Sequence, residues 1–284
     1  MTLSKIVPSK VKRFVKESRL YVRHKSSALN VYHCCVQKTA SKWLEIIFSD
    51  PRTYKYSGLV PYNYAKTFYG DFNIVQGKPT SFTDVLPQNV IVTPIYIDFQ
   101  NYLTIPKPEH FKTFFIARDP RDVVVSWYFS VRYSHRPVGR VAEHREVLND
   151  MPVSEGLLYS IDYLDEYGLF GALRSWADAP AKDPNVLLIR FEEMTAPGNH
   201  DVFRRLFLHC DIQMPDKVLS QLLDDHSFEK LSGRKRGQED QHTHYRKGVA
   251  GDWQNHFDDS ITKRFKAVTN DLVVQLAYEK DSAW

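Results

Sequence analysis

Four polar side chains of the kind that bind phosphate follow the first apolar run of the chain. The run LNVYHCCV (residues 29–36) is typical of a buried strand, and an apolar helical pattern begins at Trp43. The polar residues between them are Lys38, Thr39, Ser41 and Lys42. Junctions between a strand and a helix hold phosphate at the first helical turn, but the usual pattern G-x-x-x-x-G-K-[ST] is absent. The stretch is therefore either a phosphate-binding loop with different residues or an ordinary polar turn.

A second group of residues suited to anion binding follows the apolar run at residues 111–118. Arg118 ends this run, and Asp119 and Pro120 are typical of the cap and the first position of a helix. Ser126 follows two helical turns later. The carboxyl ends of neighbouring parallel strands border one crevice, so both loops are expected to face the same ligand. Two anion-binding loops in one crevice indicate a ligand with two separate phosphate groups.

The elements that must position these residues alternate between strands and helices. Continuous apolar runs are typical of parallel strands covered on both faces, and their alternation with helical patterns favours right-handed crossovers. The expected strands are 29–36, 89–97, 111–118 and 185–191, and the expected helices are 43–49, 121–134, 156–177, 199–210, 215–224 and 258–279. The sequence thus predicts an α/β fold, with a single doubly wound domain around a central parallel β-sheet flanked by helices. Residues 51–70 and 135–155 are expected to be long loops that face a substrate.

The composition is that of a folded protein with a sizeable core. Of 284 residues, 43% are hydrophobic and 13% aromatic, which excludes a disordered chain. No run approaches about 18 uninterrupted apolar residues, so no membrane-spanning helix is expected, and the N-terminus lacks the apolar centre of a secretory signal. Cys34, Cys35 and Cys210 have neither metal-ligand nor disulfide spacing. We interpret them as small buried hydrophobes in a reducing compartment, which predicts a cytoplasmic protein.

The first 28 residues differ from the rest in charge. The net charge of +4 is ordinary, but residues 1–28 hold many Lys and Arg and one acid, Glu17. We therefore divide the chain into a basic N-terminal segment, 1–28, and a domain at 29–284. The segment is either a solvated leader or a basic amphipathic helix that makes peripheral contact with an anionic membrane or an acidic partner. No nucleic-acid partner is expected.

Three stretches resemble the sulfotransferases that use 3′-phosphoadenosine 5′-phosphosulfate (PAPS), in particular the soluble cytosolic type. QKTASKW (37–43) is similar to the family's 5′-phosphosulfate loop P-K-S-G-T-T-W, and RDPRDVVVSWYFS (118–130) is similar to its 3′-phosphate motif. YRKGVAGDWQNHF (245–257) resembles the C-terminal signature R-K-G-x-x-G-D-W-x-x-x-F. RFEEM (190–194) and HSFEKL (226–231) are weaker matches in the same order.

The resemblance implies a P-loop-like phosphate-binding loop and assigns roles to individual residues. Lys38 corresponds to the catalytic lysine that contacts the oxygen bridging sulfur and the 5′-phosphate, where a cation stabilises the charge of the leaving group. Trp43 corresponds to the tryptophan that packs on adenine. The remaining loop residues that would hold the 5′-phosphate are Thr39, Ala40, Ser41 and Lys42. The residues that would hold the 3′-phosphate are Arg118, Ser126, Arg246, Lys247 and Gly248. The adenine pocket would include Phe191 and Ser227. The resemblance implies PAPS as donor and no metal.

Two positions in this loop and one further on depart from the family pattern. Ala40 replaces a glycine and Lys42 replaces a threonine; alanine stays small where the backbone must approach phosphate, and lysine adds a second cation. The family's catalytic histidine, which follows the second strand, is missing from VTPIYIDF (92–99). Asp98, on the same loop, is the substitute we expect to act as the base, with Tyr96 as an alternative and an ordinary turn acid as the other interpretation of Asp98.

The expected activity is transfer of a sulfuryl group to a hydroxyl or amine of a small-molecule acceptor. The alternative is a non-catalytic relative that keeps the nucleotide-binding fold, which the missing histidine motivates; a nucleotide kinase or other NTPase would leave the 3′-phosphate motif unexplained. The aromatic residues of 51–70 suggest an aromatic or apolar acceptor, although that stretch could equally pack on the body of the domain. The family's dimer motif is not matched within residues 254–263.

Overall fold

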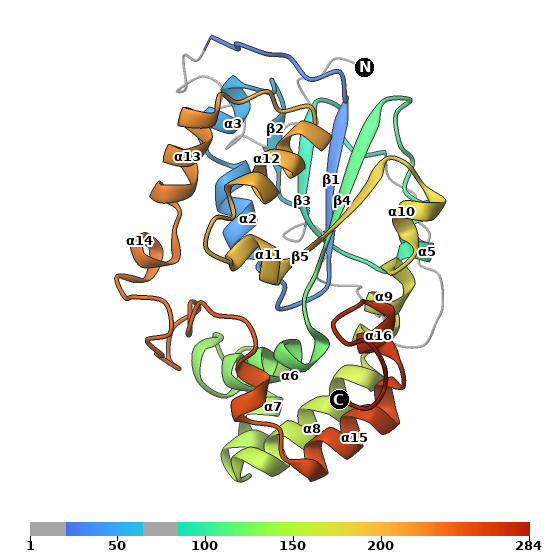
Figure 1. The fold of residues 1–284 in the computed structure, drawn as a ribbon, viewed down its shortest axis with the longest axis vertical. Helices are drawn as coiled ribbons and strands as arrows, with labels where there is room; N and C mark the ends of the chain where they lie inside the picture. The colour runs from blue at the N-terminus through green and yellow to red at the C-terminus, as the bar shows by residue number, and fades with distance from the viewer. Residues whose placement is uncertain (1–20, 65–84) are drawn as a thin grey trace.

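A five-stranded parallel sheet forms the centre of the computed structural model, which describes residues 21–64 and 85–284 (Figure 1). The strands are β1 (Asn30–Cys35), β2 (Val60–Tyr62), β3 (Val90–Tyr96), β4 (Phe111–Ala117) and β5 (Val186–Arg190). Their order in the sheet is β2-β3-β1-β4-β5, and each neighbouring pair is parallel. The predicted fold class, a single α/β domain with a central parallel sheet flanked by helices, is confirmed.

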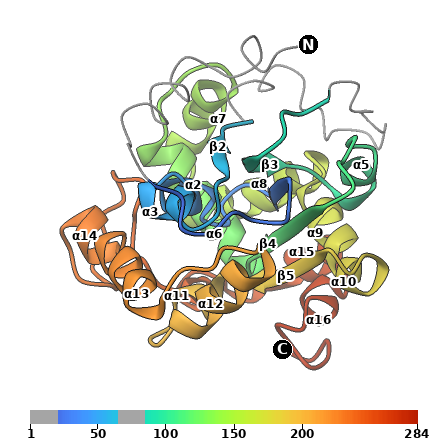
Figure 2. The same ribbon diagram turned by 90° about the horizontal axis from the view of Figure 1, so that it is seen from above.

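Alternate residues of the strands pack into two separate cores, because side chains of a strand point to opposite faces. Val31, Ile91 and Phe114 join the core on the face covered by α2, α12 and α13. Val92 and Phe115 join the larger core on the other face, with α5, α6, α8, α9 and α15. Figure 2 shows α2 and α12 on one side of the strands and α5 and α9 on the other. Both faces are thus covered, as the continuous apolar runs predicted.

The described helices occupy most of the chain between and after the strands. They are α2 (Ser41–Phe48), α3 (Pro51–Lys55), α5 (Phe99–Leu103), α6 (Pro120–Phe129), the π-helix η2 (Ser130–Ser134), α7 (Arg140–Asn149), α8 (Val153–Glu166), α9 (Leu169–Trp176), α10 (Ala179–Lys182), α11 (Phe191–Thr195), α12 (His200–His209), α13 (Asp216–Asp225), α14 (Phe228–Ser232), the 3-10 helix η3 (Asp252–Asn255), α15 (Asp259–Thr269) and α16 (Leu272–Gln275). In Figure 1, β4 runs down into α6, and α6, α7, α8 and α15 lie below the sheet. The carboxyl ends of the strands therefore face this helical layer.

Several predicted boundaries were wrong, each for a local reason. The expected helix 156–177 is two helices, because Gly168 adopts φ 81° between them. The expected helix 258–279 is likewise divided at Asn270, whose φ is 51°. The stretch 135–155, predicted as a loop, contains α7, of which Leu148 is the buried residue. A helix with so little buried surface leaves almost no apolar periodicity in the sequence.

The described part of the N-terminal segment is attached to the domain. Arg23 N–H donates to Lys55 O at 2.7 Å, and Ser27 N–H donates to a carboxylate oxygen of Asp211 at 2.6 Å. Residues 1–20, on which the predicted basic helix falls, lie outside the described residues, as do Phe68 and Tyr69 of the predicted substrate loop. Across 21–64 and 85–284, no helix is both long and apolar enough to cross a bilayer. The three cysteines are free and buried, as predicted.

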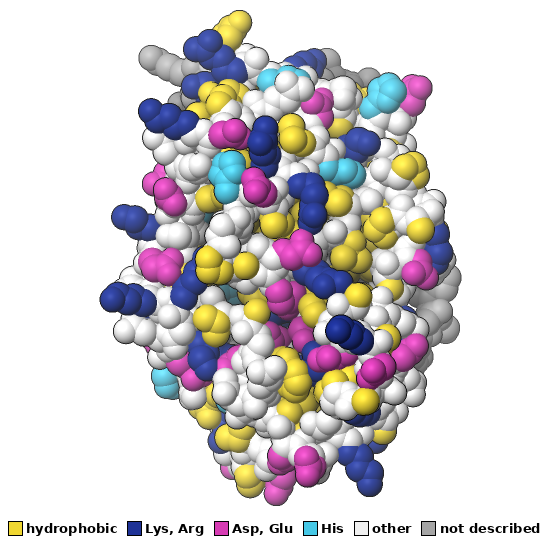
Figure 3. All heavy atoms as spheres, in the orientation of Figure 1, with side chains coloured by type: hydrophobic (Ala, Val, Ile, Leu, Met, Phe, Trp, Pro, Cys, Tyr) yellow, Lys and Arg dark blue, Asp and Glu magenta, His cyan; other side chains and the backbone are white. Residues whose placement is uncertain are grey.

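Charged side chains of both signs are interspersed on the face drawn in Figure 3. Lys and Arg lie beside Asp and Glu over most of this face, as the modest net charge of +4 implies.

Gly156 in α8 lies so close to Tyr128 in α6 that a side chain there would push the two helices apart. A Cβ atom at residue 156 would lie 2.4 Å from Cε2 of the Tyr128 ring. We expect Gly156→Ala to lower the free energy of unfolding by about 1–3 kcal/mol, because an overpacked core must shift. Urea denaturation measures the change.

Gly171→Ala in α9 is the matched control. No atom lies within 4 Å of a Cβ built there, so the better helix propensity of alanine should raise the free energy of unfolding by up to about 1 kcal/mol. An equal gain for Gly156→Ala would show that α6 and α8 are not in this close contact.

Candidate functional site

A cavity of about 1020 Å³ lies where the loops after β1 and β4 meet the C-terminal signature. Most of the residues predicted from the sequence line it. They are Lys38, Ala40, Ser41, Lys42, Trp43, Arg118, Ser126, Phe191, Arg246, Lys247 and Gly248. Thr39, Asp98 and Ser227 are not among its lining residues. Segments from three distant parts of the sequence thus surround one space.

The loop between β1 and α2 has a strained backbone. Lys38 and Ala40 adopt φ values of 68° and 64°, in the left-handed region that residues with a Cβ rarely occupy. Left-handed residues in such turns help to form concave nests of main-chain N–H groups that bind anions, and strain of this kind gathers at functional sites. Ser41, which begins α2, shares a hydrogen bond of 2.8 Å with the Tyr96 hydroxyl. The hydroxyl of Thr39 donates instead to the carbonyl of Val36.

Lys38 extends across the cavity to the helical layer. Its Nζ donates to Ser130 Oγ at 2.8 Å, one helical turn beyond the predicted Ser126. Burial, and then the positive charges of Arg118 and Arg246, lower the pKa of Lys38 from 10.5 to about 7. Three cations close enough to affect one another indicate a site that favours a multiply charged anion.

Arg118 joins the first phosphate loop to α6. Its Nη1 donates to the carbonyl of Lys38 at 2.9 Å, and its guanidinium lies 4.3 Å from the centre of the Phe191 ring. The buried Nε of Arg118 has no hydrogen-bond partner among the described residues. A buried donor without a partner is costly, so this nitrogen indicates that a ligand with acceptor oxygens fits here.

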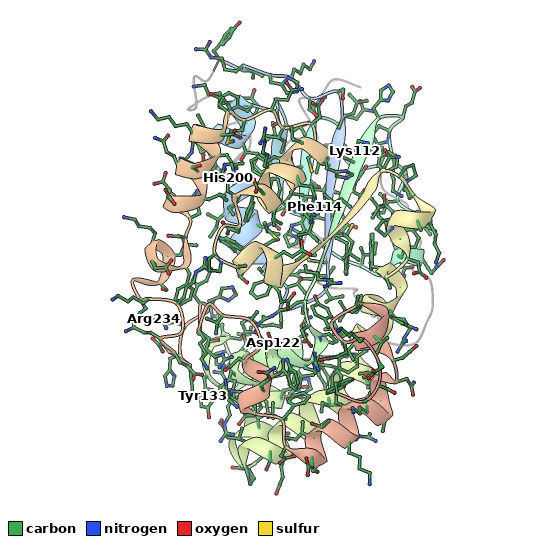
Figure 4. All side chains as sticks on the ribbon, viewed as in Figure 1. Lys112, Phe114, Asp122, Tyr133, His200 and Arg234 are labelled. Atoms are coloured by element: carbon green, nitrogen blue, oxygen red, sulfur yellow. The ribbon has the colours of Figure 1, made fainter. Side chains whose placement is uncertain are left out.

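Asp122 ties the second motif to the C-terminal signature. Its buried carboxylate accepts the N–H groups of Gly251 at 2.7 Å and Trp253 at 2.9 Å. The label in Figure 4 lies at the start of α6, between the sheet and the lower helices. The neighbouring Arg121 points away from the cavity: it binds Asp119 and is covered by the Trp253 ring at 3.8 Å. The motif therefore combines ligand-facing and structural residues.

The cations of the signature are balanced by acidic residues. Arg246 binds Asp252 at 2.5 Å and Glu239 at 2.6 Å, and Lys247 also contacts Asp252. Burial raises the pKa of Asp252, but hydrogen bonds from His256, Lys247, Asn255 and Arg246 outweigh it and hold the pKa far below its usual range.

Gly248 fits this position because of its conformation and its neighbour. It has φ 68°, and a Cβ atom there would lie 2.4 Å from the Phe228 ring. The signature glycine therefore lets the backbone pass directly over an aromatic ring that lines the cavity.

Two predicted nucleotide contacts, Trp43 and Ser227, have hydrogen-bond partners within the protein. The indole N–H of Trp43 donates to the His226 carbonyl at 2.7 Å, and its ring meets Phe203 edge-on while still lining the cavity. Ser227 caps α14 by accepting the N–H of Lys230 at 3.4 Å. Trp43 thus joins α2 to the segment before α14, and Ser227 fixes the start of α14.

Asp98, the predicted substitute base, caps α5. Its carboxylate accepts two hydrogen bonds from Asn101, one from the main-chain N–H at 2.9 Å and one from the side-chain amide. A helix cap of this kind is the ordinary structural use of an aspartate. Tyr96, the alternative, lines the cavity and contacts Ser41.

The structure adds cavity residues that the sequence did not indicate. His135 follows η2, His244 lies in the loop before the C-terminal signature, and Arg236 belongs to the basic stretch GRKRG (233–237). The aromatic wall consists of Trp127, Tyr163 and Tyr167 rather than the tyrosines of 51–64, which are not among the lining residues. Trp127 belongs to α6 and to the motif at 118–130. The others reach the cavity through the tertiary packing of η2, α8 and the 233–248 loop, so no local pattern marks them.

The described residues contain no cluster of three or more His, Cys, Asp or Glu side chains arranged to hold a metal ion.

Comparison with known proteins identifies the family of the chain. The model of the sulfotransferase domain matches residues 101–277, which is more than half of the chain but begins after the first phosphate loop. Cytosolic sulfotransferase 1 of Arabidopsis thaliana is 28% identical over 171 residues, covering 55% of this chain and 49% of that protein. Human sulfotransferase 1C2 is 24% identical over 169 residues, covering 55% and 53%. The chain thus matches about half the length of these relatives.

Solved structures show the same fold. A mouse sulfotransferase complexed with PAP (adenosine 3′,5′-bisphosphate) has a TM-score of 0.57 and 15% identity, covering 89% of this chain and 87% of that one. A retinol dehydratase in complex with retinol and PAP has a TM-score of 0.50 and 18% identity, covering 92% and 86%.

Replacing Ala40 by glycine should stabilise the protein. A left-handed conformation costs a residue with a Cβ about 1–2 kcal/mol, and the greater freedom of glycine in the unfolded chain offsets only part of the gain. We therefore expect Ala40→Gly to raise the free energy of unfolding by roughly 0.5–1 kcal/mol, as measured by urea denaturation.

Ala267→Gly, at an exposed position of α15, is the control and should lower the free energy of unfolding by about 1 kcal/mol. A loss of similar size at residue 40 would contradict the left-handed geometry of the loop.

Proposed function

Because this chain belongs to the sulfotransferase domain family, we propose that it transfers a sulfuryl group from PAPS to a hydroxyl or amine of a small-molecule acceptor. The observation that carries the proposal is the arrangement of Lys38, Arg118 and Arg246 around one cavity. PAPS has phosphate at two ends of one adenosine, so it matches cations supplied by separate motifs. PAP, the product that remains after transfer, is the nucleotide named with the structural neighbours.

The described residues fit a doubly phosphorylated nucleotide. The strained loop at 38–41 and the start of α2 would hold the 5′-phosphate, where main-chain N–H groups and the helix dipole favour negative charge. Arg118, with its unpaired Nε, and Arg246 would hold the 3′-phosphate through charge-assisted hydrogen bonds. Trp43 and Phe191 would border the adenine. The 3′-phosphate would take over some of the contacts that Arg246 makes with Asp252 and Glu239 in the free protein.

Lys38 is the residue that we assign to the chemical step. PAPS supplies the sulfuryl group, whose transfer leaves additional negative charge on the 5′-phosphate. An ammonium group at Lys38 would stabilise that charge as it develops. Ser130 supports this role, because its hydroxyl already holds Nζ of Lys38 inside the cavity.

The acceptor side of the cavity favours an aromatic or apolar molecule. Trp127, Tyr163 and Tyr167 line it together with Val131 and Val141. Such surfaces bind by apolar contact and ring packing. Retinol and androsterone are named with two structural neighbours, which supports a small apolar acceptor for this chain as well. We propose the cytoplasm as its location, because the buried free cysteines suit a reducing compartment.

Loss of either central cation should weaken nucleotide binding. We expect Arg118→Ala and Lys38→Ala each to reduce the affinity for PAP by roughly 10- to 100-fold, since a charged hydrogen-bond donor is worth about 1.5–3 kcal/mol. Isothermal calorimetry measures the affinity. Transfer of labelled sulfate from PAPS to a panel of phenols should also be lost in Lys38→Ala.

Arg264→Ala is the matched control, because Arg264 pairs with Asp162 on the outer helices and does not line the cavity. Its affinity for PAP should equal that of the wild type. Unchanged affinity in both cavity variants would reject the site. Binding without any transfer would favour a non-catalytic relative.

Binding of PAP should take up protons at slightly alkaline pH. The pKa of Lys38 is about 7 in the free protein, and a bound phosphate would raise it by favouring the charged form. Lys38 is then partly neutral before binding and protonated afterwards, so the affinity should fall as the pH rises above 7. Calorimetry in buffers of different ionisation enthalpy at pH 8 measures the uptake.

Lys38→Arg is the control, because arginine stays charged throughout this range. The variant should bind PAP with distinctly less proton uptake than the wild type. Equal uptake by both proteins would mean that Lys38 is already fully protonated in the free protein.

A further inference from the structure

Two histidines face the cavity beside Lys38, although neither lies near the place where the family carries its histidine. His135 follows η2, and His244 belongs to the 233–248 loop. Their ring centres are 6.3 Å apart, with 23° between the ring planes. Both rings are close enough to Lys38 for its charge to affect their pKa values.

The backbone of His135 is tied directly to the lysine site. The main-chain N–H of His135 donates to the carbonyl of Ser130 at 2.7 Å, closing the π-turn of η2, and the hydroxyl of Ser130 holds Lys38. The His135 carbonyl in turn accepts from the guanidinium of Arg145 in α7. π-turns are rare and occur frequently at functional sites. The single turn at Ser130–His135 therefore fixes the positions of both Lys38 and His135.

The 233–248 loop, which carries His244, is held in place by Arg234. Its guanidinium donates to the carbonyls of Gln238, Tyr245 and Arg246 and so fixes the curve of the 233–248 loop. The rings of Tyr133 and His242 meet edge-on with centres 5.7 Å apart, which packs this loop against η2. Tyr133 and Arg234 are both labelled in Figure 4, on the same side of the molecule. His244 lies at the exposed edge of this wall, whereas His135 is half-buried.

The ring of His135 is free to exchange a proton. Within the described ranges, its nitrogens have no hydrogen-bond partner, unlike His33, which binds Thr93, and His209, which binds two carbonyls. Burial, followed by the charges of Lys38, His244 and Arg145, lowers the pKa of His135 to about 4. The imidazole is then neutral near pH 7 and able to accept a proton.

The ligand would make His135 a stronger base. An anion beside Lys38 favours the charged form of a neighbouring imidazole and raises its pKa towards the working pH, where a general base is most effective. Burial and the charges of Lys38 and Lys42 lower the pKa of His244 to about 4 as well, but its ring is exposed to water, whereas that of His135 is half-buried. The half-buried ring is therefore the better placed of the two.

We propose that His135 is the general base of the transfer reaction, an inference that rests on the proposed function. The acceptor hydroxyl gives its proton to a ring nitrogen of His135 as its oxygen forms a bond to sulfur. The bond between sulfur and the bridging oxygen breaks, and its electron pair remains on the 5′-phosphate of PAP, next to Lys38. The imidazolium then releases the proton to water.

The test compares His135→Gln with the wild type at saturating PAPS, using 4-nitrophenol and the less acidic 4-methylphenol as acceptors. We expect kcat with 4-methylphenol to fall by about 10²–10⁴-fold, and much less with 4-nitrophenol, because an acidic phenol needs less help to lose its proton. The ascending limb of the pH profile of kcat should disappear. Affinity for PAP, measured by calorimetry, should remain within about twofold, since glutamine keeps the size and polarity of the site.

His110→Gln is the control, because His110 is exposed, precedes β4 and does not line the cavity. It should match the wild type with both phenols. Unchanged kcat with 4-methylphenol in His135→Gln, or equal loss with both phenols, would overturn the assignment while leaving the proposed function in place. A large loss in His244→Gln but not in His135→Gln would overturn it in favour of the other ring. A wild-type protein that binds PAP but transfers to neither phenol would reject both the activity and the base.

Discussion

The buried carboxylate of Asp122 is the constraint on which the arrangement of the site depends. A buried charge is stable only when it is paired and hydrogen-bonded, and this one is satisfied by two main-chain N–H groups, from Gly251 and Trp253, with the guanidinium of Arg118 3.9 Å away. These contacts fix the C-terminal signature against the start of α6. Because Arg118 also binds the Lys38 carbonyl, one short network sets the relative positions of all three motifs.

Bringing cations together has an electrostatic cost, which the free protein limits in two ways. Asp252 and Glu239 neutralise Arg246, and Lys38 loses part of its charge as its pKa falls to about 7. An anionic ligand reverses both effects, because it offers a better partner to arginine and favours the protonated lysine. The repulsion between the cations is thus limited in the free protein, and a bound anion would reduce it further.

The sequence predicted the local structure of the second motif well, but it did not predict the contacts that this motif makes with distant residues. Asp119 caps α6 and Pro120 begins it as expected, since caps depend on a few neighbouring residues. The role of Asp122 as a link to residue 251 could not be predicted from the sequence, because its hydrogen-bond partners lie far along the chain. Asp98 was singled out for its place after β3, yet the same residue type is also a common helix cap, and it serves as one here. The three-residue strand β2 was too short to show any period.

The absence of a histidine after β3 need not remove proton transfer, since a general base is defined by its distance from the reacting atoms and not by its place in the sequence. The requirement is a neutral ring beside Lys38, the residue that we assign to the leaving group. His135 meets it through η2, whose π-turn carries Ser130 at one end and the histidine at the other. A regular helix would place residue 135 at a different angle around its axis. In this proposal, the irregular turn at the end of α6 supplies the histidine that is missing after β3.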